Sequence, residues 1–285
     1  MSFPKKNKIR IAILDLYEGH ANQGMRCIRE ILNRFGDEKN LDISWDEFDV
    51  RQKLEVPDLS YDIFISTGGP GSPLDSEGSN WEHAYFTWLH KVQSWNYSAV
   101  NPQKKYVFFI CHSFQLACRH YNIGKVCQRK STSFGVFPIH LLNDGKEEVV
   151  FHQMKDPFYV VDSRDFQVVE PIHNNLVEMG ATILAIEKER PHVNLERAIM
   201  AVRFNEYMIG TQFHPEADAV GMSMHLQTEE KKRTVIENHG EEKWTSMIEQ
   251  LNDPDKIMFT YEHILPNFLA IAVKSLQKSF EPVAI

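Results

Sequence analysis

The sequence has few cysteines and lacks any long apolar run. Of its 285 residues only four are cysteine, at positions 27, 111, 118 and 127, and no two of them form a CxxC pair. This is too few for a disulfide scaffold. No segment approaches the ~18 uncharged residues of a membrane span. The N-terminal stretch MSFPKKNKIRIAILDL has no long apolar core or cleavage site of a signal peptide. We therefore expect a cytoplasmic protein without a membrane partner.

An excess of positive charge is also missing. The chain has 31 basic and 39 acidic residues, which gives a formal net charge of -8. Such a balance provides no electrostatic reason to expect nucleic acid as a partner. The content of 42% hydrophobic and 25% charged residues is ordinary for a globular chain. A small-molecule substrate or a protein contact is therefore expected.

Short apolar runs that end in glycine or polar residues alternate with helical patterns in the first half of the chain. The runs cover residues 9–15, 61–67 and 106–110, which is typical of strands buried on both faces. This alternation predicts a three-layer α/β/α fold with a mainly parallel, flavodoxin-like sheet. Strand-like pieces follow Gly135, and the chain turns helical beyond Ala217. We expect one domain over residues 1–217 and a helical C-terminal extension, 218–285, packed on it.

A cysteine and a histidine each stand where an expected strand ends. Cys111 follows the apolar run of FFICHSFQLA, and His214 lies in GTQFHPEA, two residues before Glu216. Taken singly, Cys111 is typical of a buried structural thiol and His214 of a hydrogen-bonded structural histidine. Together with Glu216 they supply a nucleophile, a base and a carboxylate that orients the base. Because ligands bind beyond the carboxyl ends of parallel strands, we expect these side chains to meet there.

A glycine-rich loop, TGGPGS at residues 67–72, occupies a third strand end. Glycines let backbone N–H groups approach a ligand closely, so the loop can offer a donor to a developing oxyanion. It lacks the lysine and the spacing of a phosphate-binding loop.

In this order, the glycine loop, the strand-end cysteine and FHPE make the sequence similar to the class I glutamine amidotransferases, such as the glutaminase domain of GMP synthase. The resemblance covers about Lys8 to Ala217. It implies that Cys111 attacks the side-chain amide of glutamine, with His214 as general base and acid oriented by Glu216. It also implies further roles: the backbone N–H groups of His112 and of Gly69 or Gly71 as oxyanion hole, and Gln115, Ser163 and Phe166 as contacts of the substrate. Neither a metal nor an organic cofactor is implied.

The sequence departs from the family pattern beside the cysteine and in the substrate segment. Phe109 and Ser113 stand where the family usually has glycines, and the phenylalanine either points into the core or narrows the acyl pocket. We expect His112 to contact solvent or a loop, although an imidazolium there would favour the thiolate. Arg164 and Asp165 replace residues that are often histidine and glycine in the family, which bears on specificity for glutamine.

These departures leave two other interpretations open. Homoserine acyltransferases resemble this layout, use Cys, His and Glu, and have a serine–arginine pair where Ser163 and Arg164 fall. A non-catalytic regulatory relative is the second alternative. No synthetase domain follows FHPE within this sequence, so we expect any ammonia acceptor to belong to a separate synthetase chain.

Overall fold

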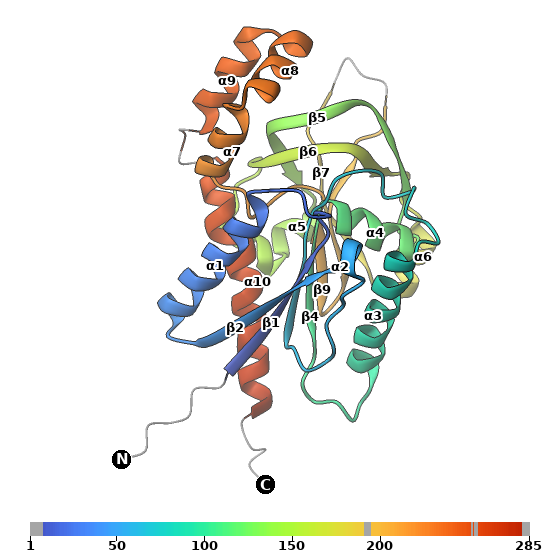
Figure 1. Ribbon diagram of the computed structural model, residues 1–285. Coiled ribbons are helices and arrows are strands. Elements are labelled where there is room, and N and C mark those ends of the chain that lie inside the picture. Colours follow the sequence, from blue (N-terminus) through green and yellow to red (C-terminus); the bar gives the residue numbers. More distant parts are fainter. Residues whose placement is uncertain (1–7, 191–194, 252, 254–255, 281–285) are drawn as a thin grey trace.

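In the part of the chain that the structure describes, nine strands form one mixed sheet at the centre of the molecule. The computed structural model describes residues 8–190, 195–251, 253 and 256–280 (Figure 1). The strand order is β2-β1-β3-β4-β9-β8-β7-β5-β6. The strands are β1 (Lys8–Asp15), β2 (Asp42–Asp49), β3 (Ile63–Ser66), β4 (Tyr106–Ile110), β5 (Lys125–Leu141), β6 (Phe158–Val169), β7 (Thr182–Glu187), β8 (Ile199–Asn205) and β9 (Met208–Thr211).

The half of the sheet that carries the expected site is parallel. β2, β1, β3, β4 and β9 pair in parallel, and all further pairs from β9 to β6 are antiparallel. β4 lies between β3 and β9, so the glycine loop, Cys111 and the segment leading to His214 leave the sheet at one edge. The α/β fold class is confirmed, and the strands after Gly135 continue the same sheet rather than forming a separate layer.

Helices cover both faces of this sheet (Figure 1). They are α1 (Gly24–Lys39), α2 (Val50–Lys53), α3 (Asn80–Tyr97), α4 (His112–His120), α5 (Asn143–Glu147), the short 3-10 helix η1 (Val149–Phe151), α6 (His173–Met179), α7 (Ala219–Leu226), α8 (Glu229–His239), α9 (Glu241–Leu251) and α10 (Ile257–Phe280). One core joins α1 and α10 to the sheet, and a second core on the opposite face contains residues of α3 and α4. These are the three expected layers.

Local sequence explains why the covering helices form where they do. In α1, apolar residues recur at helical spacing, and all of them are buried: Met25, Ile28, Ile31, Leu32 and Phe35. In α3, the hydroxyl of Ser79 accepts a hydrogen bond from the backbone N–H of Glu82, which caps the helix start. Tyr85 and Trp88 then face the sheet, with exposed fractions of 0% and 1%.

The helices after residue 218 pack in two different places. α10 packs along the sheet in the same core as α1. α7, α8 and α9 lie at one end of the molecule, beside β5 and β6 (Figure 1), where Met222, Leu226 and Met247 pack on Val136 and Val161. The boundary at residue 217 stays a prediction.

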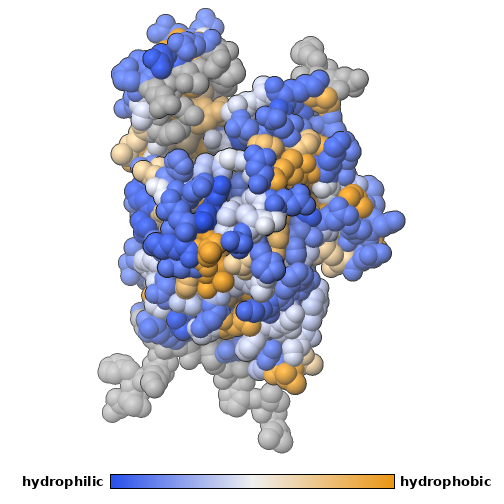
Figure 2. Space-filling view, turned by 45° about the vertical axis from the view of Figure 1, so that its right-hand side comes forward, coloured by the Kyte–Doolittle hydropathy of each residue, from blue (hydrophilic) through white to orange (hydrophobic). Residues whose placement is uncertain are grey.

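The face shown in Figure 2 is mostly hydrophilic, and its apolar side chains form small separate patches. Scattered patches of this size are usual on a protein surface. Among the described residues, no helix combines the length and the hydropathy that a membrane crossing requires.

Candidate active site

Cys111 lies in the tight turn between β4 and α4. Its backbone has φ 49° and ψ -97°, a region that residues other than glycine rarely adopt. The turn is fixed on both sides, because the N–H of Cys111 donates to the carbonyl of Thr211 at 2.8 Å and its carbonyl accepts from Gln115 N–H at 3.0 Å. Strained backbone of this kind persists only where the surroundings hold it, and it clusters at active sites.

His214 is held by its backbone and by a carboxylate. Its N–H donates to the carbonyl of Val161 at 3.0 Å, and its Nδ1 lies 2.8 Å from Oε1 of Glu216, whose side chain is 1% exposed. Burial disfavours the imidazolium, but attraction and hydrogen bonding to Glu216 and Cys111 outweigh it and raise the pKa of His214 well above its ordinary value. The arrangement therefore favours the protonated imidazolium form of His214 beside the sulfur of Cys111.

Five of the expected site residues line one cavity of about 580 Å³: Gly69, Cys111, Ser163, His214 and Glu216. The sulfur of Cys111 is 3.8 Å from the carbonyl oxygen of Ser163. Phe134, Val161 and Met222 add apolar wall. The volume is in the range of small-molecule sites.

Gly68 of the glycine loop lies directly beside the side chains of His214 and Cys111. A Cβ added there would lie 2.8 Å from Cε1 of His214 and 3.6 Å from Cβ of Cys111. A Cβ at Gly69 would lie 2.4 Å from the carbonyl oxygen of Leu16, so this position also requires glycine. Gly71 is exposed and is not among the described residues that line the cavity. Of the two glycines considered for the oxyanion hole, only Gly69 therefore lies on the wall.

Gln115 and Phe166 lie behind Cys111 and not on the described wall of the cavity. Gln115 is 3% exposed, and its Nε2 donates to the carbonyl of Phe166 at 3.2 Å. Direct contact of either residue with a substrate stays a prediction.

The expectation that the His112 side chain contacts solvent is wrong. It is 1% exposed, and burial together with Arg51 and Arg119 lowers its pKa to about 3. The side chain is therefore neutral near pH 7 and supplies no charge to the thiol. Its backbone N–H is at the first position of α4, where no partner exists within the helix.

The structure explains both residues that replace family glycines around Cys111. Phe109 is fully buried in the core on the α3 and α4 side, and it fits because Gly210, opposite it on β9, has no side chain. Ser113 is also fully buried, and its hydroxyl donates to the carbonyl of Ser66 at 2.7 Å while accepting from Ile110 N–H at 2.8 Å. Phe109 is not among the described residues that line the cavity, and Ser113 joins the ends of β3 and β4.

Arg164 belongs to a buried ion cluster beside the site. Its side chain is 1% exposed and pairs with Asp162 at 2.9 Å and with Glu187 at 3.2 Å. Arg129 binds the same Glu187 at 3.0 Å. Asp165 is exposed and bonds to Thr132. The guanidinium of Arg164 is therefore already paired with protein carboxylates.

Tyr17 is a wall residue that the sequence analysis missed. Added Cβ atoms at Gly24 and Gly68 would lie 2.2 and 3.5 Å from its hydroxyl, and the same two positions adjoin Glu216 and His214, so the hydroxyl lies near both. Burial, Glu216 and Cys111 raise the pKa of Tyr17 well above its usual value, so it stays protonated. It follows the end of β1, and the same strand-end argument that selected Cys111 would have found it.

Across the described ranges, no group of three or more His, Cys, Asp or Glu side chains is arranged to hold a metal ion.

Comparison with known proteins gives the family. The family model described as glutamine amidotransferase class-I matches residues 22–233. A glutamine amidotransferase from Thermotoga maritima superimposes with a TM-score of 0.65 at 17% identity, covering 93% of this chain and 98% of that chain. The Trypanosoma brucei CTPS glutaminase domain with bound acivicin gives 0.52 at 16% identity, covering 73% and 86%.

A glutamine amidotransferase from Methylobacillus flagellatus also gives 0.52, at 14% identity, covering 99% of this chain and 98% of that chain. A search of the curated proteins found no match. At these identities the solved structures support the fold alone, whereas the family model spans most of the chain. The chain belongs to the class I glutamine amidotransferase family.

Proposed function

We propose that the protein hydrolyses the side-chain amide of glutamine through a glutamyl thioester on Cys111 and passes the ammonia to an acceptor. The observation that carries this proposal is the 2.8 Å contact between His214 and Glu216 in the same cavity as the strained Cys111. This combination gives an activated thiol, its proton carrier and a carboxylate that holds the carrier.

The steps follow from these positions. The Cys111 thiolate attacks the amide carbon, and the oxyanion that forms accepts hydrogen bonds from the N–H groups of His112 and Gly69. Such a donor contributes ~3 kcal/mol to lowering the barrier. As the intermediate collapses, the C–N bond breaks and His214 protonates the nitrogen, which leaves as ammonia. Water, deprotonated by His214, then attacks the thioester, and the C–S bond breaks to release glutamate.

We propose a separate synthetase chain as the partner that accepts the ammonia. The similarity to the glutaminase domain of Trypanosoma brucei CTPS supports this proposal. In the serine–arginine pair that suggested an acyltransferase, the guanidinium of Arg164 is already bound to Asp162 and Glu187, which favours the glutamine reaction.

The test measures ammonia and glutamate from glutamine, together with labelling of Cys111 by an electrophilic glutamine analogue. Cys111→Ala should abolish both. Cys27→Ala is the matched control: this thiol lines the same cavity, but burial raises its pKa to about 12. Glutaminase activity that survives Cys111→Ala would sink the proposal. Acyl-homoserine formed from homoserine and an acyl-CoA, without ammonia from glutamine, would favour the acyltransferase instead.

A further inference from the structure

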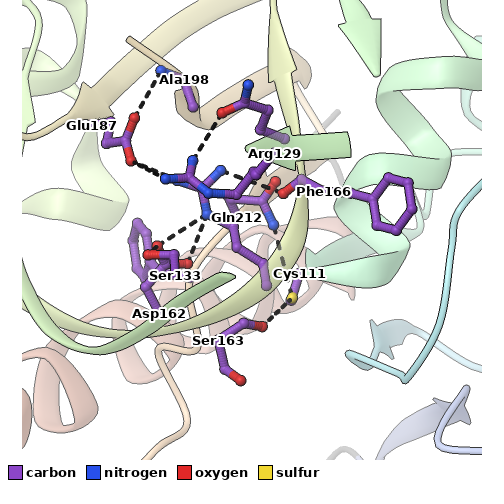
Figure 3. Close-up of polar contacts among 12 residues, drawn as sticks. Cys111, Arg129, Ser133, Asp162, Ser163, Phe166, Glu187, Ala198 and Gln212 are labelled. Atoms are coloured by element: carbon purple, nitrogen blue, oxygen red, sulfur yellow. Dashed lines mark hydrogen bonds and ion pairs between the residues drawn. The ribbon is translucent and has the colours of Figure 1, made fainter. Parts of the chain in front are cut away.

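A second carboxamide, that of Gln212, lies against the sulfur of Cys111. Gln212 follows β9 and is fully buried, and its Nε2 is 3.8 Å from Sγ of Cys111 (Figure 3). The distance is within reach of an N–H to sulfur hydrogen bond. Gln212 lies on the protein side of the sulfur and is not among the described residues of the cavity wall. Its contact with the sulfur therefore leaves the substrate side open.

The surrounding hydrogen bonds fix which end of this amide faces the sulfur. The carbonyl of Phe166 can only accept, so Gln115 must present its Nε2 to it, at 3.2 Å. The same Nε2 lies 3.1 Å from Oε1 of Gln212. The oxygen of Gln212 is thus used by Gln115, and its N–H groups are turned toward Cys111. A flipped amide at either glutamine would put like groups together.

The buried ion cluster also contacts the Phe166 carbonyl to which the Gln115 amide is bonded. Nη1 of Arg164 approaches the carbonyl of Phe166 at 3.5 Å, and the guanidinium is anchored by Asp162 and Glu187. A polar network in a dry interior is stiff when its members are paired, and its hydrogen bonds are stronger than in water. The donor at Cys111 therefore has a fixed position before substrate arrives.

We propose that Gln212 is a further catalytic residue, whose N–H stabilises the Cys111 thiolate, and that Gln115 is a positioning residue that sets the orientation of the Gln212 amide. This inference rests on the proposed function, in which Cys111 is the nucleophile. A hydrogen bond donated to a charged group favours that charged form, and the donor here acts on the thiolate from the side opposite the substrate. Gln115 then acts on Cys111 through Gln212.

The test is the pH dependence of Cys111 alkylation by iodoacetamide, followed by peptide mass spectrometry so that the other three cysteines are read separately. Gln212→Met removes the donor at similar length. Gln212→Glu keeps an acceptor for Gln115 but places a carboxylate beside the sulfur. Gln167→Met is the matched control, because Gln167 Nε2 also lies 3.8 Å from a sulfur, that of Cys127, away from the cavity.

Gln212→Met should raise the midpoint of the alkylation profile by about one pH unit, which slows alkylation of Cys111 about tenfold at pH values below both midpoints. Gln212→Glu should shift the midpoint further because of its like charge, whereas Gln167→Met should stay within about twofold of the wild type. If Gln212→Met fails to fold, the midpoint measured for the isosteric Gln212→Glu decides whether the proposal holds.

An unchanged midpoint in a folded Gln212 variant overturns the proposal, as does an equal shift in Gln167→Met. The assay needs no turnover. A shifted midpoint in a protein that does not hydrolyse glutamine would therefore refute the proposed function alone, and normal hydrolysis with an unshifted midpoint would refute the role of Gln212 alone.

Discussion

Gly68→Ala should impair catalysis without removing any reacting group. The added Cβ would lie 2.8 Å from Cε1 of His214, whereas ordinary contact begins near 3.4 Å. The ring or the loop must therefore move by about 0.6 Å. Because a misplacement of ~1 Å can cost ~100-fold in rate, we expect kcat to fall on the order of tenfold.

The same substitution should leave the protein folded. Gly68 does not have a positive φ, so alanine meets no backbone strain there. Overpacking costs ~1–3 kcal/mol, partly offset by ~0.4–1 kcal/mol from the more restricted unfolded chain. The free energy of unfolding should decrease only modestly, and this can be measured by urea denaturation beside the glutaminase assay.

Gly36→Ala in α1 is the matched control for this experiment. There the nearest atoms, those of Ile43, are 3.7–3.8 Å from the added Cβ, which is ordinary contact. We expect wild-type kcat and a gain of up to ~1 kcal/mol in stability from the better helix former. A Gly68→Ala enzyme with wild-type kcat would refute the conclusion that this loop confines the His214 ring.

Two further predictions concern stability. The pKa of His112 in the folded protein, about 3, is below its ordinary value of 6.5. The neutral, buried ring therefore contributes fully to the free energy of unfolding above pH 6.5. This contribution is lost as the pH falls toward 3, by up to ~1.4 kcal/mol per pH unit. His112→Gln should therefore flatten the loss of unfolding free energy between pH 6 and 4, and equal slopes would contradict its burial as a neutral ring. Arg164→Met should lower the free energy of unfolding by ~3–5 kcal/mol, because it leaves the buried carboxylates of Asp162 and Glu187 without this partner. Arg29→Met, which removes an exposed pair with Glu47, should lower it by at most ~1 kcal/mol. Similar losses for the two variants in urea denaturation would refute the distinction.

The sequence by itself determined the parallel half of the fold and the segments that carry the candidate site. Strands buried on both faces read as continuous apolar runs, and the carboxyl ends of parallel strands share one edge. Locating the ends of three runs therefore predicted that the glycine loop, Cys111 and His214 come together, and the structure places all three segments at one cavity.

Only the tertiary structure decided which neighbours those residues have. Phe109 and Gly210 are about a hundred positions apart in the sequence. The Phe109 side chain fits because Gly210 has no side chain, and the two residues become neighbours only when β4 pairs with β9. The burial of His112 and the direction of the Gln212 amide likewise depend on partners from distant segments. Periodicity along a chain encodes the ends and faces of each element, whereas hydrogen-bond partners and burial follow from how the elements pack.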